Sequence, residues 1–337
     1  MPGQDPSFGL YEIREGESMK NPLTVSIGPH IRAKVSTSRI MWGVNLALIP
    51  AGAAGVFIFG VYSLYVIMAS VISAVVTEWA ILALRKKEFA IFDGSAILTG
   101  LLLAYNLPPD VPLWLPVAGS FFAIAIGKQV FGGLGHNIFN PALTGRAFLM
   151  ISWPVHMTTW QNPRWQVDAI TTATPLELLK HNKSILLKGT TYMDLFMGNR
   201  GGCIGEVCVV ALLIGAAYLI LKKYISWHIP VTFVASVALF SWVFNGFNGF
   251  FTGDALFYCL SGGLVLGAFF MATDYVTSPL SAKGKIIFGI GCGVLTFLIR
   301  KYSGYPEGVS YAILIMNAAT PIIDRYSFPR WFGWRKA

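Results

Sequence analysis

The polar stretch DAITTATPLELL, residues 168–179, holds the side chains with the clearest capacity for chemistry. It places threonine hydroxyls at Thr171, Thr172 and Thr174, shortly after the carboxylate of Asp168. Local physics gives the last threonine a structural role, because a hydroxyl before Pro-Leu-Glu is a common helix N-cap with proline at the first helical position. Taken alone, the stretch predicts a capped helix that begins at the proline.

A second group of chemically capable residues falls inside apolar segments. In FGGLGHNIFNPALTGRAFL, residues 131–149, an Asn-Pro pair must interrupt any helix, and the freed backbone groups must line a cavity or another chain. Charged groups are costly in lipid, so an arginine here needs an anionic partner. The candidate residues for a ligand site or an ion path are Gly132, Gly133, Gly135, Asn137, Asn140 and Arg146.

Two further breaks carry carboxylates. FFMATDYVTSPLSAKGK, residues 269–285, contains Asp274, and the last apolar segment ends at Asp324. Both can cap helices or pair with nearby lysine and arginine. Asp274 is equally a candidate for a Na⁺ path, since hard oxygen ligands suit that ion.

Composition places these residues in a membrane protein. Hydrophobic residues make up 55% of the chain and charged residues only 12%, whereas soluble domains carry about 25% charged residues. The long apolar runs do not alternate with polar residues, which excludes a β-barrel. We therefore predict an all-α polytopic membrane protein. Its net charge of +9 is explained by topological basic residues, and no nucleic acid partner is expected.

The cysteines indicate no metal centre of their own. Cys203, Cys208, Cys259 and Cys292 form no C-x-x-C motif and no cluster with histidine, so neither a zinc site nor a four-cysteine cluster is expected. Cys203 remains open as a ligand shared with another protein of an assembly.

Apolar segments long enough to cross a membrane number about ten. Two of them, 95–107 and 139–153, are short and end at prolines. The other expected spans are 40–60, 61–84, 112–131, 204–221, 229–244, 256–271, 286–299 and 309–323.

Basic residues decide the expected orientation, because cytoplasmic loops carry an excess of lysine and arginine. With ten spans, most of these residues, Arg85 and Lys128 among them, fall on the side of both tails. We expect a cytoplasmic tail (1–39), a first membrane half with spans one to five (40–153), an extracytoplasmic loop with the threonines (154–203), a second half with spans six to ten (204–323) and a cytoplasmic tail (324–337). The breaks at 131–149 and 269–285 hint at two inverted repeats.

The strings GGLGHNIFNPALTGRAFL, DAITTATPLELL, GNRGGCIGE, MATDYVTSPLSAKGKIIFG and YPEGVSYAILIMNA together resemble one family. It contains the D subunit of the Rnf complexes, which are ion-pumping ferredoxin:NAD⁺ oxidoreductases, and the B subunit of the sodium-pumping NADH:quinone reductases. The resemblance runs from about residue 25 to 330, and the short N-terminal tail favours the Rnf member.

The resemblance implies a redox role for the threonines. Family members carry FMN joined by a phosphodiester to a threonine, within a pattern close to Asp-x-x-Ser-Gly-Ala-Thr. The residues from Asp168 to Thr174 fall on that pattern, which makes Thr174 the acceptor. Thr171 keeps the hydroxyl of the family's serine, whereas Thr172 replaces glycine and offers a competing hydroxyl; Ala173 matches. Arg164 and Arg200 are candidate neighbours of the phosphate.

The implied protein is a membrane redox subunit and not a complete enzyme, since no nucleotide-binding G-x-G-x-x-G follows a strand. The resemblance implies a bacterial inner-membrane flavoprotein that works with the other Rnf subunits, a flavin transferase and Na⁺ or H⁺. Riboflavin or another second, noncovalent flavin is also expected from the relatives. The alternatives are the quinone-reductase member of the family and a flavin-free channel or solute carrier.

Overall fold

Helices form all the regular structure in the part of the chain that the computed structural model describes. The described residues are 36–86, 91–165, 176, 191–245, 249–303 and 308–327. Residues Thr37–Ala337 form one compact unit, separate from Met1–Ser36. Most of the expected N-terminal tail, the threonine motif and the end of the C-terminal tail therefore lie outside the described residues.

The first half contains long helices followed by short, interrupted ones. Its elements are α1 (Thr37–Phe59), α2 (Val61–Leu84), the 3₁₀ turn η1 (Ile91–Asp93), α3 (Ser95–Tyr105), α4 (Trp114–Ile124), the π-helix η2 (Ala125–Gln129), α5 (Pro141–Ser152) and α6 (Pro154–Met157).

The second half follows the loop that contains the threonines. Its elements are α9 (Tyr192–Met197), α10 (Val209–Leu221), α11 (His228–Phe244), α12 (Ala255–Leu260), α13 (Leu264–Leu266), the π-helix η3 (Gly267–Met271), α14 (Ala282–Tyr302) and α15 (Val309–Ser327).

The predicted class, an all-α membrane protein, is confirmed. Among the described residues, α1, α2 and α14 are long and apolar enough to cross a membrane, and α3, α10 and α11 are shorter apolar helices. Each of the expected apolar segments contains helix. Several are too short to cross alone, because breaks divide them.

One expected span, 256–271, is not a continuous helix. It breaks at Gly262 and Gly263, whose φ values of +68° and +65° are ones that residues with a side chain rarely adopt. Arg300 of α14 donates to the carbonyls of Tyr258 (2.8 Å), Ser261 (2.9 Å) and Gly262 (3.0 Å). The continuous prediction was wrong because apolarity does not reveal a break whose carbonyls are satisfied by a distant arginine.

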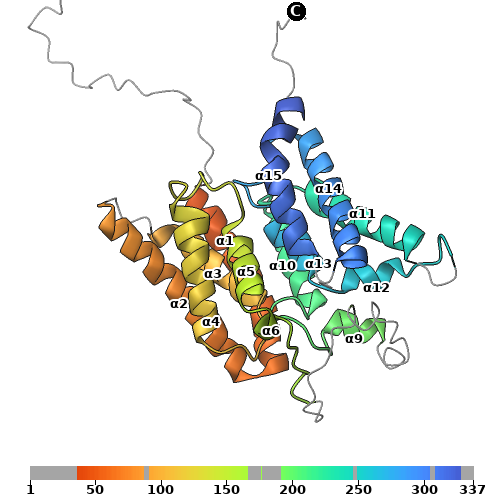
Figure 1. Ribbon diagram of the computed structural model, residues 1–337, viewed down its shortest axis with the longest axis horizontal. Coiled ribbons are helices and arrows are strands. Elements are labelled where there is room, and N and C mark those ends of the chain that lie inside the picture. The colour runs from red at the N-terminus through yellow and green to blue at the C-terminus, as the bar shows by residue number, and fades with distance from the viewer. Residues whose placement is uncertain are drawn as a thin grey trace, which may run out of the picture. The chain divides into compact units, whose positions relative to one another are not determined.

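Helix packing repeats between the two halves. In the first, α2 packs against α3 and α4, and α4 against α5; in the second, α11 packs against α12 and α14, and α14 against α15. Figure 1 shows these two groups side by side. The leading helices α1 and α10 pack against each other and run antiparallel, since Ala47 faces Gly215 while Gly55 faces Ile204. The arrangement is that of an inverted repeat.

The packing order shows which break of the first half corresponds to which break of the second. The 130–140 break lies between η2 and α5, and its counterpart lies between α14 and α15. The 272–281 break lies between η3 and α14, and its counterpart joins α3 to α4. The sequence-based pairing of 131–149 with 269–285 was therefore wrong, because any two glycine- and proline-containing breaks resemble each other in composition.

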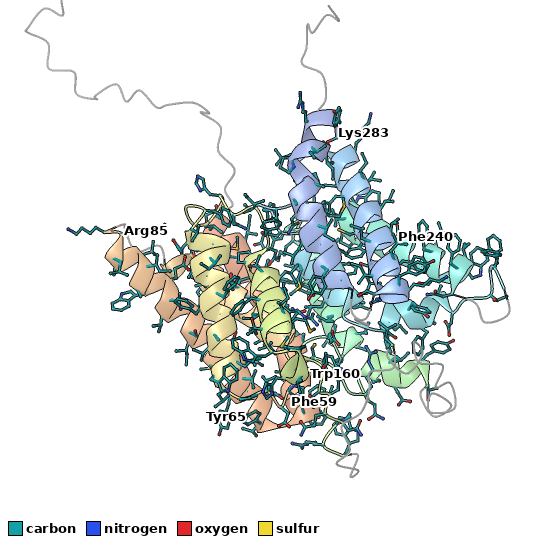
Figure 2. All side chains as sticks on the ribbon, in the orientation of Figure 1. Phe59, Tyr65, Arg85, Trp160, Phe240 and Lys283 are labelled. Carbon is teal, nitrogen blue, oxygen red and sulfur yellow. The ribbon has the colours of Figure 1, made fainter. Side chains whose placement is uncertain are left out.

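Labelled residues in Figure 2 mark the two ends of the first-half helices. Figure 2 shows Arg85 and Lys283 towards one end of the molecule, and Phe59 and Trp160 towards the other. The Arg85 guanidinium donates to the carbonyl of Gln129 (2.7 Å), which places the end of η2 beside the end of α2. The expected orientation, with the end that holds Arg85 in the cytoplasm, stays a prediction.

Close contact between α1 and α10 depends on Gly215, where a Cβ would overlap the carbonyl oxygen of Ala47. We expect Gly215→Val to push the two helices apart and to lower stability by about 1–3 kcal/mol or more. Thermal unfolding of the detergent-solubilised protein measures the effect. Ala217→Val on the exposed side of α10 is the control, and equal melting temperatures for the two variants would contradict the packing.

Candidate functional site

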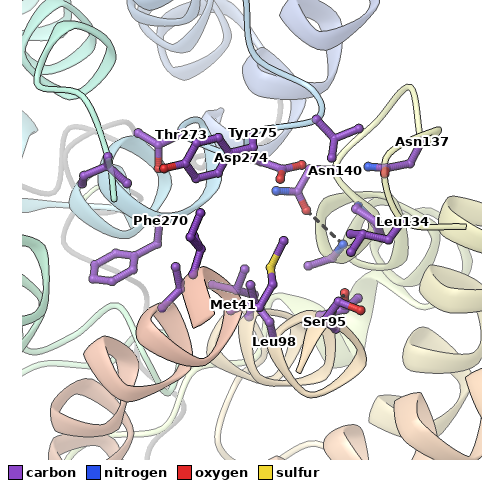
Figure 3. Close-up of a pocket in the computed structure, with 18 of the residues that line it drawn as sticks. Met41, Ser95, Leu98, Leu134, Asn137, Asn140, Phe270, Thr273, Asp274 and Tyr275 are labelled. Atoms are coloured by element: carbon purple, nitrogen blue, oxygen red, sulfur yellow. Dashed lines mark hydrogen bonds between the residues drawn. The ribbon is translucent and has the colours of Figure 1, made fainter. Parts of the chain in front are cut away.

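A largely apolar pocket lies where the breaks of the two halves meet. Its walls come from α1, α3, η2, the start of α5, and the segment from η3 to Val276. Its interior volume is about 70 Å³, below the roughly 300–1,000 Å³ of small-molecule sites. Figure 3 shows Met41 and Leu98 on one side, with Asn140 and Asp274 close together on the other.

Both π-helices contribute to the pocket wall. In η2 the Val130 N–H donates to the Ala125 carbonyl (3.0 Å), and in η3 the Ala272 N–H donates to the Gly267 carbonyl (2.8 Å). π-Helices are rare in proteins, and those that occur are often found at functional sites. Here they place Lys128 of η2 and Phe270 of η3 on the pocket wall.

Asn140 joins the two breaks. Its Oδ1 accepts from the backbone N–H groups of Ala142 (3.0 Å) and Leu143 (3.4 Å), and so caps α5 with Pro141 at the first position. Its Nδ2 donates to the Met271 carbonyl at the end of η3 (3.2 Å). One asparagine thus satisfies backbone groups from both halves.

Asn137 offers a polar group to a ligand. Its Nδ2 donates to the Phe139 carbonyl (3.1 Å), while its buried Oδ1 has no partner among the described residues. Burying an acceptor without a donor costs free energy. A bound molecule that donates a hydrogen bond to this oxygen would recover that cost. Asp274, on the same pocket, accepts from the Thr277 hydroxyl (3.1 Å).

A buried ion pair stands beside the pocket. Lys128 Nζ lies 2.7 Å from Glu78 Oε1 and 2.6 Å from the Ser95 hydroxyl, and the Gln129 amide donates to Glu78 (2.8 Å). Lys128 is 1% exposed and Glu78 4%. Lys128 had been counted only among the basic residues that set the orientation, and its buried partner was not predicted.

Glu78 was not among the residues predicted to form a site. A signal was present, because a lone carboxylate in the apolar 61–84 segment is a functional candidate by default. Its partner could not be read from the chain, since Glu78 and Lys128 are separated by 50 positions.

The candidate residues of the 131–149 stretch divide into two sets. Asn137 and Asn140 line the pocket with Asp274. Gly132, Gly133 and Gly135 do not; they shape the preceding loop, with φ values of +119°, +103° and +94°.

Arg146 lies apart from the pocket. It is buried in α5 and donates to Asn106 Oδ1 (2.5 Å) and towards Cys203 Sγ (3.8 Å). The Cys203 thiol also lies 3.3 Å from the Asn106 carbonyl. Arg146 and Cys203 therefore join the end of α3 to the segment before α10 within this chain.

The motif residues Asp168, Thr171, Thr172, Ala173 and Thr174 lie outside the described residues, as does most of the helix expected to follow them. Leu176 is described and is 4% exposed. Its side chain packs at the break between α12 and α13, where a Cβ added to Gly262 would lie 3.1 Å from it and 2.9 Å from Arg300.

The two arginines expected near a phosphate occupy different places. Arg200 is buried and donates to the Leu260 carbonyl (2.8 Å), at the α12–α13 break that Leu176 contacts. Arg164 is exposed at the end of α1, above the ring of Phe57.

Helix α9 lies near the end of the loop 154–203 and begins with a well-formed N-terminal cap. Its capping box pairs Thr191 with Asp194, and the hydrogen bonds from Thr191, led by its backbone N–H, lower the pKa of Asp194. This cap stabilises α9 at neutral pH and weakens as the pH falls through that lowered pKa. The Tyr192 hydroxyl donates to Asp254 (2.5 Å), a bond that raises the pKa of Tyr192 and ties α9 to α12.

Comparison with known proteins identifies the family of this chain. The model of the NQR2, RnfD, RnfE family matches residues 24–333. The chain belongs to this family. The family resemblance drawn from the sequence motifs is confirmed over the whole expected range, about residue 25 to 330.

Three relatives within the family show how close the similarity is. The D subunit of the proton-translocating ferredoxin:NAD⁺ oxidoreductase complex of Clostridium ljungdahlii is 53% identical over 331 residues, covering 96% of this chain and 100% of the relative. Its Na⁺-translocating counterpart from Acetobacterium woodii is 51% identical, covering 93% and 96%. The D subunit of an ion-translocating oxidoreductase complex of Stutzerimonas stutzeri is 40% identical, covering 88% and 92%.

The buried ion pair gives a test of the site's electrostatics. We expect Lys128→Met to destabilise the protein by about 3–5 kcal/mol, because it leaves the Glu78 carboxylate buried without its cation. Adding Glu78→Leu should recover most of that loss, since it removes the stranded charge. Thermal unfolding in detergent measures both variants, and a double variant no more stable than the single one would contradict the pairing.

Proposed function

We propose that this chain is the D subunit, a membrane redox protein, of an ion-translocating ferredoxin:NAD⁺ oxidoreductase in a bacterial inner membrane. It passes electrons between ferredoxin and NAD⁺ through covalently bound FMN, coupled to Na⁺ or H⁺ translocation. The observation that carries the proposal is the match to relatives of that name at 53% and 51% identity over almost the full length of both chains. The chain acts with the other subunits of the complex and is not a complete enzyme alone.

The proposed acceptor of FMN is the Thr174 hydroxyl, esterified by a flavin transferase. The motif from Asp168 to Thr174 supports it. The packing of Leu176, which follows the motif closely in sequence, against the α12–α13 break gives further support. Arg200 and Arg300 bond carbonyls at that break, and positive charge favours a phosphodiester.

The flavin, once attached, supplies a carrier that accepts electrons in pairs or singly. The chain's own residues contribute position and electrostatics. Leu176 anchors the tether, and Arg200 and Arg300 hold the break beneath it by bonding the carbonyls of α12. A covalent tether keeps the cofactor at high effective concentration without a deep pocket.

We place a second, noncovalent flavin such as riboflavin at the pocket between the two halves, which has to widen to admit it because its volume is about 70 Å³. Its apolar walls from α1 and α3 match a flat aromatic ring system. The buried Asn137 Oδ1, which lacks a donor among the described residues, suits a ring N–H or a ribityl hydroxyl. Lys128, paired with Glu78, lies on the same wall.

The coupling ion is proposed as Na⁺ or H⁺, with Asp274 and the breaks around it on the ion path. The names of the first two relatives above differ, one being proton-translocating and the other Na⁺-translocating, at nearly equal identity. A carboxylate can serve either ion. Moving one charge against 100 mV costs about 2.3 kcal/mol, so the ion must be driven by a redox-linked change in the protein.

Two alternatives make different predictions. The B subunit of a quinone reductase would carry the same flavin, but its complex would reduce quinone from NADH and not NAD⁺ from ferredoxin. A flavin-free channel or solute carrier would contain no bound flavin after denaturation. The relatives, which are all named as D subunits, favour the ferredoxin-linked interpretation.

Removal of one hydroxyl tests the covalent flavin. We expect Thr174→Ala, co-expressed with a flavin transferase, to lose one FMN from the denatured chain, because only Thr174 falls on the acceptor position of the motif. Intact mass and in-gel fluorescence measure it. Thr171→Ala and Thr172→Ala are the matched controls and should keep the FMN; FMN that persists in Thr174→Ala would move the ester to one of them.

Asn137 tests the second flavin separately. Asn137→Leu removes a buried hydrogen-bonding group from the pocket wall and should weaken binding of noncovalent flavin about 10-fold. Flavin released on denaturation of the purified complex measures it, while FMN on Thr174 should stay constant. If wild type and variant release equal amounts, the pocket does not hold that flavin through Asn137.

A further inference from the structure

A groove on the lipid-facing side of the first half runs between α1 and α2. Its lining is apolar except for the Tyr105 hydroxyl in the wall and Arg164 at one end. Small residues of α1, Gly52 and Ala53, open the groove, and Leu64 of α2 forms part of the other wall. The Tyr105 hydroxyl already donates to the Leu48 carbonyl (2.8 Å), so Arg164 is the group that can attract a charged ligand.

Arg164 is held in place at the end of this groove. Its backbone N–H donates to the Ile58 carbonyl (3.0 Å), which fixes the loop across the end of α1. Its guanidinium carbon lies 5.7 Å from the centroid of the Phe57 ring, itself 67% exposed. Of the described carboxylates, none forms an ion pair with Arg164. An exposed cation therefore faces outward above an apolar channel.

Aromatic residues place Arg164 at the level of a membrane interface. Trp165 lies beside it, with its ring 6.1 Å from Phe57 and its indole N–H bonded to Asn199 (2.6 Å). Tyr62, at the start of α2, donates its hydroxyl to the Val111 carbonyl (3.0 Å). Tryptophan and tyrosine gather where acyl chains meet headgroups, which is also where a phosphate would lie.

We propose that this groove binds one anionic phospholipid, with an acyl chain along Gly52 and Ala53 and the headgroup phosphate on Arg164. The argument is one of charge complementarity: the occupant must be apolar along its length and anionic at one end. A guanidinium matches two phosphate oxygens at once. Eight residue steps from Ile49 to Phe57 give a channel about 12 Å long.

The test measures the affinity of phosphatidylglycerol for the delipidated complex in detergent. We expect Arg164→Gln to weaken binding about 10-fold, the loss of one charge-assisted contact. Ala53→Leu should weaken binding as well, because it fills the groove and leaves the arginine in place. Phosphatidylcholine, which lacks net charge, should bind less tightly than phosphatidylglycerol to the wild type.

Lys301 supplies the matched control. It is likewise an exposed cation above aromatic rings, 5.9 Å from Phe244 and 5.7 Å from Phe297, but it does not line the groove. Lys301→Gln should leave phosphatidylglycerol binding unchanged, and FMN content should be unchanged in Arg164→Gln.

Three outcomes would overturn the proposal. The first is equal phosphatidylglycerol affinity for wild type and Arg164→Gln. The second is a photo-crosslinker at position 53 that captures a peptide of another protein of the complex, which would make the groove a protein interface. The third is loss of FMN from Arg164→Gln, which would assign this arginine to the flavin phosphate.

Discussion

Backbone groups freed by broken helices have to be satisfied inside the membrane, and the rest of this structure depends on how that is done. Lipid offers no hydrogen bonds, so every interrupted segment needs a partner from the protein. Arg300 satisfies the carbonyls where α12 ends. Asn140 caps α5 and reaches the carbonyl at the end of η3. Because these partners come from distant elements, the breaks are locked together.

The same bonds explain where the site lies. Asn140 holds the end of η3 against the start of α5, and the two π-helices then line one pocket with α1 and α3. Polar groups that the helices cannot satisfy internally, such as Asn137 Oδ1, point to a ligand. The buried pair of Lys128 and Glu78 places charge beside this pocket. Elsewhere, Arg300 and Arg200 fix the α12–α13 break that Leu176 contacts.

Much of the fold could be read from the sequence, because long apolar runs such as that of α2 predict membrane helices directly. The break at Gly262 could not, since its stability depends on Arg300, which lies 38 positions away. Asn140 and Asp274 stood out as polar residues in apolar segments, yet their meeting on one pocket depends on how two halves fold together. The pairing of Lys128 with Glu78 could not be read from the chain, because the two residues lie 50 positions apart. Arg146 and Asn137 are both polar residues in the same apolar stretch. Only the folded structure shows that Arg146 connects two segments, whereas Asn137 lines the pocket.

The central claim is that electrons cross this protein through a flavin held at the Thr174 loop. The most direct measurement is the rate at which the purified complex reduces NAD⁺ with reduced ferredoxin, compared between wild type and a flavin-free Thr174 variant assembled with all other subunits. The account predicts that NAD⁺ reduction is lost in the variant. A variant complex that lacks this flavin and still reduces NAD⁺ at the wild-type rate would contradict it.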